Sequence, residues 1–291
     1  MSRVAYVNGR YVPHAEAQVH VEDRGYQFAD GVYEVLAVRG GRLIDIEAHN
    51  DRLERSLKEL RIAMPMSREA LSHVMRETVR RNRVTNGIIY LQVSRGVARR
   101  DHPFPKAAVT PAVVMTARNT PPTPAAHLED GIAVKTMPDI RWERCDIKSV
   151  SLLPNVLAKQ AAREAGAYEA WLVDEQGQVT EGSSTNAWIV DKEGSLVTRP
   201  LAQDILSGIT RLMVIELARK DGITVVERPF TVAEAKQARE AMLSSTTSFV
   251  TPITRIDGTV VANGKPGTMA LRLRALYEAH VAKQIEAPRA A

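Results

Sequence analysis

A proline-rich segment, NTPPTPAAHLEDG at residues 119–131, interrupts this chain near its middle. Three prolines within a few residues, followed by polar residues and a glycine, are typical of a linker, because proline neither continues a helix nor donates to a central strand. The chain has 291 residues, and roughly 100–200 residues usually form one domain. We therefore expect two domains, residues 1–120 and 132–291, joined by a linker at 121–131.

Strands and helices are predicted in groups on both sides of this linker. The elements expected before it are hairpins over 4–13 and 32–46, a helix over 47–62, a helix that begins after Ser67, and strands over 88–96 and 109–117. The elements expected after it are a strand over 132–137, a helix from Pro154 to Gly166, hairpins over 170–182 and 186–198, a helix over 210–221, a capping box at Thr231–Glu234, a hairpin over 254–261 and a C-terminal helix. Such grouping favours an α+β fold over a doubly wound sheet.

Composition and charge argue against several classes of protein. The net charge is +5, the basic residues are spread along the chain and aromatic residues make up only 5%, so we expect no nucleic-acid partner. No apolar run approaches the roughly 18–20 residues of a membrane helix, and the first residues lack the apolar centre of a signal peptide. Cys145 is the one cysteine, so no intrachain disulfide can form, and a reducing cytoplasm is the expected location.

The common metal and nucleotide motifs are absent from the sequence. Its seven histidines form no H-x-x-x-H or H-E-x-x-H pair, and one cysteine cannot build a zinc cluster, so we expect no metal site. Neither a G-x-x-x-x-G-K-[ST] loop nor a G-x-S-x-G elbow occurs. The chemistry must therefore come from other residues.

Lys148 lies in an apolar stretch, with Ile147, Val150 and Leu152 as neighbours. If this stretch is a buried strand, the lysine points into the interior or into a cleft. A buried lysine is costly as a cation, and a neutral lysine suits Schiff-base formation with an aldehyde. A solvated lysine on an edge strand is the alternative that the pattern leaves open.

Three further segments carry groups that bind anions. Glu181 opens the run EGSSTN, Gly208 leads into a predicted helix near Thr210, and residues 243–248 read LSSTTS. A helix N-terminus offers free N–H groups to a phosphate, although each segment alone is compatible with an ordinary loop or turn. Together with Lys148 they supply what pyridoxal phosphate (PLP) needs: a partner for the aldehyde, a partner for the ring nitrogen and an anion cradle.

Four longer motifs occur in the order EDRGYQFADGVYEV, DIRWERCDIKS, TEGSSTN and SGITR. In this order they resemble the fold-type IV class of PLP-dependent aminotransferases, and within it the D-amino-acid aminotransferases. The resemblance extends from about Val4 to Glu278. It implies a two-domain α+β architecture, with a smaller N-terminal domain and a larger C-terminal domain that binds PLP.

The resemblance also implies roles for individual residues. Lys148 would hold PLP as a Schiff base and move the proton of the substrate α-carbon, and Glu181 would pair with the ring nitrogen. The other residues implied to hold the cofactor are Arg52, Arg141, Ser184, Ile209, Thr210 and Thr246. For Arg141, a salt bridge to a neighbouring acid is the alternative.

Tyr33, Arg100 and His102 are similar to the residues that bind the substrate α-carboxylate in the D-amino-acid enzymes. An arginine, a histidine and a phenol suit a carboxylate chemically. In that family the arginine and histidine come from the neighbouring subunit, so the resemblance implies a homodimer with a shared active site. Asp101, between Arg100 and His102, departs from the small residue of the family and is able to pair with either Arg99 or Arg100.

The function implied is transamination between a D-amino acid, of the D-alanine or D-glutamate class, and 2-oxoglutarate or pyruvate. Three alternatives on the same fold are a branched-chain L-aminotransferase, an (R)-amine transaminase and aminodeoxychorismate lyase. A PLP-binding protein without catalysis and a basic nucleic-acid binder are the alternatives from other classes.

Overall fold

The structure is a computed structural model that describes residues 3–287. It divides into two compact units. The first unit comprises the described residues up to Pro121, the short segment Ile147–Ser151 and the described chain from Gln284 onward. The second unit comprises Pro122–Asp146 and Leu152–Lys283. Lys148 therefore belongs to the first unit, although it follows the proline-rich segment in the sequence.

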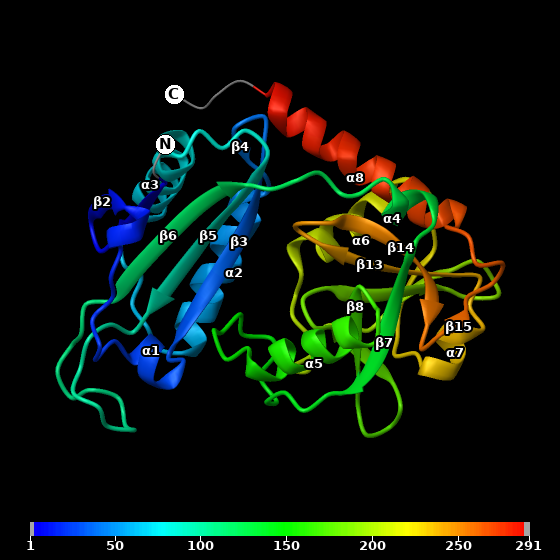
Figure 1. The fold of residues 1–291 in the computed structure, drawn as a ribbon, viewed down its shortest axis with the longest axis horizontal. Helices are drawn as coiled ribbons and strands as arrows, with labels where there is room; N and C mark the ends of the chain where they lie inside the picture. Colours follow the sequence, from blue (N-terminus) through cyan, green and yellow to red (C-terminus); the bar gives the residue numbers. More distant parts are fainter. Residues whose placement is uncertain (1–2, 288–291) are drawn as a thin grey trace. The chain divides into compact units, whose positions relative to one another are not determined.

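The first unit is built on a six-stranded antiparallel sheet with the strand order β2-β1-β6-β5-β3-β4 (Figure 1). Its strands are β1 (Val4–Val7), β2 (Arg10–Pro13), β3 (Gly31–Arg39), β4 (Arg42–Leu43), β5 (Gly87–Ser94) and β6 (Ala112–Asn119). The predicted hairpin at Asn8-Gly9 is confirmed. Both turn residues have positive φ, +46° and +91°, as the tight hairpin turns favoured by Asn-Gly require.

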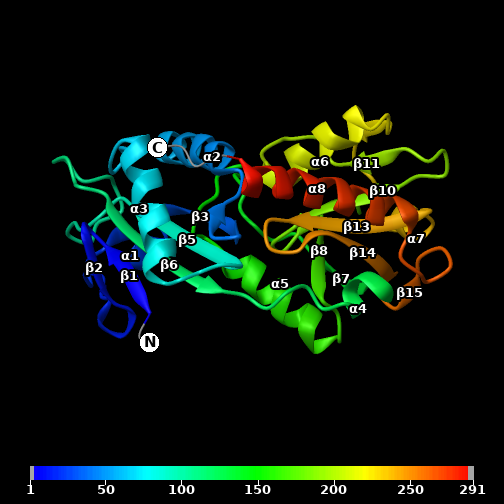
Figure 2. The same ribbon diagram turned by 90° about the horizontal axis from the view of Figure 1, so that it is seen from above.

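Two helices, α2 (Ile46–Glu59) and α3 (Arg68–Arg81), cover one face of this sheet (Figures 1 and 2). Leu53 and Leu57 of α2 and Leu71 and Met75 of α3 enter one core with the inward residues of the strands. Ser67 caps α3 as predicted, because its side chain accepts the N–H of Ala70. Two shorter helices complete the unit, a 3₁₀ turn at His14–Glu16 and α1 (Arg24–Phe28).

The second unit contains a nine-stranded mixed sheet. Along the order β12-β11-β10-β13-β14-β7-β8-β9, the pairs β11–β12, β14–β7 and β7–β8 are parallel and the others antiparallel, and β15 pairs with β14. The strands are β7 (Ile132–Pro138), β8 (Glu169–Val173), β9 (Val179–Gly182), β10 (Asn186–Val190), β11 (Leu196–Thr198), β12 (Val225–Glu227), β13 (Glu240–Ser245), β14 (Phe249–Ile256) and β15 (Thr259–Val260). This mixture of strand directions confirms the α+β class.

Helices pack around this second sheet. They are α4 (Ala126–Glu129), α5 (Leu153–Glu164), α6 (Ile209–Lys220), α7 (Val232–Lys236) and α8 (Thr268–Glu286), the last of which belongs to the first unit from Gln284 onward. Ala158 and Ala162 of α5 pack against Ala170 and Leu172 of β8. Within residues 3–287, no helix combines the length and the apolar character that crossing a membrane requires.

Several predicted boundaries differ from the structure. The helix expected over 47–62 ends at Glu59, and the strand expected from residue 109 begins at Ala112. At the predicted capping box, Thr231 accepts the Glu234 N–H as expected, but the Glu234 carboxylate pairs with Arg228. An arginine provides a charged partner, and a charge-assisted hydrogen bond is stronger than a neutral one.

Candidate active site

Lys148 lies beside the first residues of β3. The β4 strand pairs only with the far end of β3, so the start of β3 has a free edge. The chain around Lys148 occupies that edge: the Tyr33 N–H donates to the Lys148 carbonyl at 3.0 Å, and the Val150 N–H donates to the Gly31 carbonyl at 3.1 Å. The segment is a single bridge between Val32 and Ser149 and not a full strand.

The Lys148 side chain is half-buried and lies against an aromatic ring. Its Nζ is 4.2 Å from the centre of the Tyr33 ring, and Tyr33 stacks on Tyr90 with 5.7 Å between ring centres. Burial, followed by the neighbouring Tyr33, raises the pKa of Tyr90 to about 12. Tyr33 therefore lies beside the amine that the sequence singles out, and Tyr90 stacks on Tyr33.

Arg52 is held in a buried cluster on the other face of β3. Side chains alternate along a strand, so Tyr33 and Glu34 point to opposite faces. The Glu34 carboxylate accepts hydrogen bonds from Arg52 Nε at 2.8 Å and from Arg52 Nη2 at 2.7 Å. His49 Nδ1 is 2.7 Å from the same carboxylate. The role of Arg52 in a phosphate seat stays a prediction.

The charges in this cluster are strongly coupled. Burial favours the neutral form of Glu34, but the charge and hydrogen bonds of Arg52, supported by His49, outweigh it and lower the pKa of Glu34 to about 2. Burial lowers the pKa of His49, and the positive charges of Arg52 and Lys148 lower it further against the opposing effect of Glu34. The cluster therefore contains an ionised glutamate and arginine beside a histidine that resists protonation.

Arg100 and His102 lie in an irregular loop of the first unit, between β5 and β6. Both side chains are exposed, and both contact Phe28 of α1: the Arg100 guanidinium is 5.1 Å from its ring centre, and the His102 ring centre is 5.5 Å away. Asp101 Oδ1 accepts the N–H of His102 at 2.9 Å. The two residues predicted to bind the substrate carboxylate, Arg100 and His102, thus contact the same phenyl ring.

Glu181 ends up buried in the second unit, on β9. Its carboxylate accepts Asn186 Nδ2 at 3.0 Å, the N–H of Leu206 at 3.2 Å and Nη1 of Arg141. Burial raises the pKa of Glu181, although Arg141 and the Leu206 N–H oppose this rise. Arg141 therefore forms a direct ion pair with Glu181. A salt bridge to an acidic residue was the alternative interpretation of Arg141 in the sequence.

Asp139 fixes the orientation of Arg141. Its two carboxylate oxygens accept Arg141 Nε at 2.9 Å and Nη2 at 2.7 Å, and Thr180 donates to the same carboxylate at 2.7 Å. Burial opposes the charge on Arg141, but the hydrogen bond to Asp139 and the charge of Glu181 outweigh it and raise the pKa of Arg141. The guanidinium is therefore a permanent cation beside Glu181.

The start of α6 has the features of a phosphate-binding site. Gly208 precedes the helix without any side-chain cap, and the first N–H groups of a helix have no partner within it. Thr210 is 2% exposed, and its Oγ1 has no hydrogen-bond partner among the described residues. A Cβ on Gly208 would lie 2.0 Å from Asn186 Oδ1, so a larger residue at this position would force the Asn186 side chain to move. Ile209 and Thr210 thus present two N–H groups and an unpartnered hydroxyl.

Thr246 and Ser184 occupy nearby turns of the same sheet. Thr246 is half-buried and follows β13, whose Ser244 pairs with Asn186 of β10. Ser184 is exposed, and its Oγ donates to Glu169 at 3.0 Å. The contacts of these two residues with a cofactor stay predictions.

Sequence reasoning missed several residues that support the site. Glu34, Asp139, Glu169 and Asn186 are polar residues on or beside strands, and each has a hydrogen bond to a predicted site residue. The signal for Glu34 was present in VYEV, because a charged residue at an inward position of an apolar strand needs a buried partner. The identity of that partner required the folded structure.

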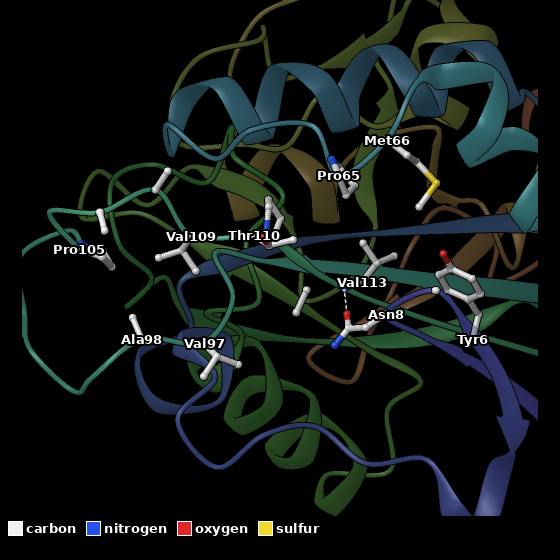
Figure 3. A pocket seen from close by; sticks show the side chains of 15 residues that line it. Tyr6, Asn8, Pro65, Met66, Val97, Ala98, Pro105, Val109, Thr110 and Val113 are labelled. Carbon is white, nitrogen blue, oxygen red and sulfur yellow. Dashed lines mark hydrogen bonds between the residues drawn. The ribbon is translucent and has the colours of Figure 1, made fainter.

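An open groove of about 800 Å³ lies elsewhere in the first unit (Figure 3). Its walls come from the start of the chain, from Pro65 and Met66, and from the loop that follows β5, with Val97, Ala98 and Pro105 among the lining residues. Figure 3 shows the hydrogen bond between the Asn8 side chain and the Val113 N–H across its floor. None of the predicted site residues lines this groove.

Comparison with known proteins then identifies the family. The model of the family described as amino-transferase class IV matches residues 31–256. The D-alanine aminotransferase of Staphylococcus aureus (strain MSSA476) is 41% identical over 277 residues, which are 95% of this chain and 97% of that protein. The chain belongs to the class IV aminotransferases.

Solved structures of class IV aminotransferases agree with this assignment. The branched-chain amino acid aminotransferase of Escherichia coli superposes with a TM-score of 0.88 at 25% identity, covering 96% of this chain and 94% of that one. A branched-chain amino acid aminotransferase from T.th., solved with pyridoxamine 5'-phosphate, gives 0.87 at 27% identity, covering 97% and 95%. The fold-type IV architecture expected from the motifs is confirmed, and the protein is a PLP-dependent aminotransferase that takes amino acids and 2-oxo acids as substrates.

The residues of the chain fit this cofactor. The unpartnered Thr210 hydroxyl and the glycine-lined start of α6 suit a phosphate. Glu181 is a buried carboxylate beside a permanent cation, so it suits a protonated ring nitrogen. Nζ of Lys148 has the Tyr33 ring as its contact and forms no ion pair within residues 3–287, so the amine is available to an aldehyde.

Proposed function

We propose that this aminotransferase transfers the amino group between a D-amino acid, of the D-alanine or D-glutamate class, and a 2-oxo acid such as 2-oxoglutarate or pyruvate. The observation that carries the proposal is the pair Arg100 and His102, presented together on Phe28. A guanidinium and an imidazole that contact the same ring provide donors that match a carboxylate. The 41% identity to a D-alanine aminotransferase over nearly the whole chain supports the same substrate class.

We assign the cofactor to the residues that the resemblance implies. Lys148 would hold it covalently, Glu181 would pair with the ring nitrogen, and Arg141 and Ser184 would lie close to the ring. The phosphate would be bound by Arg52, Ile209, Thr210 and Thr246. PLP, when bound, supplies an aldehyde that takes up the amino group and a ring that accepts electrons.

Lys148 is the residue we assign to proton transfer. Its Nζ would remove the proton from the α-carbon of the substrate, which is general base catalysis by a positioned amine. The Nζ lies 4.2 Å from the centre of the Tyr33 ring, so the amine lies against one of the residues that we assign to the substrate carboxylate. Glu181 would hold its negative charge against the ring nitrogen, with Arg141 opposing protonation of the carboxylate.

Tyr33, Arg100 and His102 are the residues we assign to the substrate carboxylate. As the resemblance implies, Arg100 and His102 would serve the active site of the partner subunit, so the working enzyme would be a homodimer. Their exposure in this chain supports that assignment, because neither side chain is buried by its own unit. A cytoplasmic location is also proposed, because a chain whose one cysteine is a buried thiol uses no disulfide.

A half-reaction without an acceptor tests the function. We would record the absorbance of the PLP-loaded protein before and after adding D-alanine, and then repeat the measurement with L-leucine. Loss of the band near the visible edge with D-alanine alone, together with formation of pyruvate, is the expected result. A response to L-leucine alone would reassign the enzyme to the branched-chain group.

The branched-chain alternative has one observation in its favour, the TM-scores of 0.88 and 0.87 with branched-chain enzymes. Their identities of 25% and 27% are well below the 41% of the D-alanine enzyme, and a fold is compatible with several substrates. A band that ignores both amino acids would point to the lyase or the (R)-amine transaminase.

A further inference from the structure

The loop that carries Arg100 and His102 makes backbone hydrogen bonds to the segment around α1 at its start, through Arg95, Gly96 and Ala98. It connects β5, which ends at Ser94, to β6, which begins at Ala112, and it contains no helix or strand. On one side Val97, Ala98 and Pro105 line the open groove of Figure 3. The conformation of such a loop must be set by specific contacts, because it has no core packing on that side.

Phe28, the last residue of α1, makes direct contact with both Arg100 and His102. The Arg100 guanidinium lies 5.1 Å from the centre of its ring, and the His102 ring centre lies 5.5 Å from it. Arg24, on the same helix, adds a third contact at 4.8 Å. A cation within about 6 Å of a ring centre is attracted by the ring face, which applies to the two arginines, and the His102 ring contacts Phe28 as a tilted aromatic pair. One phenyl ring therefore contacts both Arg100 and His102.

Arg24 also binds the backbone of the loop at Asp101 and His102. Its Nη1 donates to the Asp101 carbonyl at 2.6 Å, and its Nη2 donates to the His102 carbonyl at 3.3 Å. The Arg24 side chain is only 3% exposed, so the donor groups of these hydrogen bonds are shielded from water. The carbonyls on which they act belong to the two residues that follow Arg100.

Asp30 connects Arg24 to Arg95, the residue that follows β5. Its carboxylate accepts Arg24 Nε at 2.8 Å and Arg95 Nε at 2.7 Å. Arg95 in turn donates to the Leu60 carbonyl at 2.7 Å and lies 3.8 Å from the ring centre of Phe104. The arginines on Asp30 lower its pKa in spite of burial, so the anchor is ionised. The loop is thus fastened on both sides of His102.

We propose that Phe28 and Arg24 are positioning residues that set the geometry of Arg100 and His102 for the substrate carboxylate. This inference rests on the proposed function, which assigns the carboxylate to those two side chains. Neither Phe28 nor Arg24 needs to touch the substrate. They act by restricting the loop, so that less conformational entropy is lost when a carboxylate binds.

Phe28→Leu tests the inference with little change in apolar character. We expect the KM for D-alanine to rise about fivefold, since a cation–π contact is worth about 1 kcal/mol, while kcat stays within about twofold. A rise in KM at constant kcat is the signature of lost binding that is equal in ground and transition states. The absorbance of bound PLP should be unchanged. Phe28→Tyr keeps the ring and should keep the wild-type KM.

Tyr26→Leu is the matched control. Tyr26 lies on the same short helix and is 76% exposed, so its loss removes an aromatic ring from α1 without removing a contact to the loop. Its KM should match the wild type. Equal increases in KM for Phe28→Leu and Tyr26→Leu would overturn the inference, because they would reflect a general loosening of α1.

A double-mutant cycle separates failure of the inference from failure of the proposed function. Arg100→Gln alone should raise the KM, and adding Phe28→Leu or Arg24→Gln to it should raise the KM by clearly less than in the wild-type background, since residues that act through one another are not additive. Full additivity would overturn the positioning role alone. An Arg100→Gln variant with the wild-type KM would overturn the carboxylate assignment, and the half-reaction with D-alanine reports separately on the activity.

Discussion

Arg141 and Glu181, 40 residues apart in the sequence, form a buried ion pair in which Arg141 Nη1 donates to Glu181 Oε1. Burial raises the pKa of Glu181, and Arg141 is the strongest influence that opposes this rise. The pair therefore determines whether the carboxylate carries the charge that a protonated ring nitrogen needs.

Replacing Arg141 by Gln should raise the pKa of Glu181 further, because the opposing positive charge is lost. A Glu181 that protonates at higher pH supports activity only at higher pH, so the acidic limb of kcat/KM against pH should move to higher pH. Arg144→Gln is the control, since Arg144 lies three residues after Arg141 and pairs with Asp146. An unchanged acidic limb in Arg141→Gln would contradict this role of the pair.

Lys148→Ala should abolish transamination. Removing a positioned acid–base group typically costs about 10²–10⁴-fold in rate, and the covalent attachment of the cofactor would be lost as well. We would measure pyruvate formed from D-alanine and the absorbance of the variant with added PLP. Lys192→Ala is the control, because Lys192 is exposed in the turn between β10 and β11. Full turnover by Lys148→Ala would contradict the assignment.

A mixture of two defective chains should recover activity if the active site is shared. Lys148→Ala lacks the amine and Arg100→Gln lacks the proposed carboxylate ligand, but a mixed dimer has one site with both residues intact. We expect activity at low D-alanine concentration to appear after the two variants are co-expressed and the mixed dimer is isolated with two tags. An inactive mixed dimer of the correct size would show that Arg100 serves its own subunit.

Glu34→Gln should destabilise the protein at neutral pH by about 3–5 kcal/mol, because it removes the negative charge that Glu34 supplies to the buried Arg52. The pKa of Glu34 is lowered to about 2 in the folded state, so its stabilising effect is fully present above its unfolded pKa, near 4.5, and is lost as the pH falls through 2. Denaturant unfolding at several pH values measures this. Glu16→Gln, at an exposed position, should change stability little, and a constant difference down to pH 2 would contradict the coupling.

Cys145 should not react with iodoacetamide in the native protein near pH 8. Burial raises its pKa to about 12, and the thiolate is the reactive form. Its Sγ also donates to the Trp142 carbonyl at 3.0 Å. Mass spectrometry after alkylation, with a sample unfolded in urea as the control, measures the modified fraction. Rapid modification of the folded protein would show that this segment opens.

Elements specified by neighbouring residues were predictable. The hairpin at Asn8-Gly9 follows from residues that accept positive φ, and the start of α3 follows from Ser67, whose side chain accepts an N–H three residues later. By contrast, α1 escaped prediction. It has five residues, which are too few to show a repeating apolar pattern at helical spacing. Its cap depends on Asp23, whose side chain accepts the N–H of Gly25. The helix that supports Arg100 was thus invisible to pattern analysis.

The sequence by itself determined the family, the fold class and the residue types of the site, because motifs and hairpin turns depend on residues that are close in the chain. Only the tertiary structure decided which polar groups meet: Arg52 with Glu34, Arg141 with Glu181, and Arg24 with the carbonyls of Asp101 and His102. The physical reason is that a buried charge must find a counter-charge, and several acids and bases satisfy that need equally well until the packing of strands and helices brings one pair together.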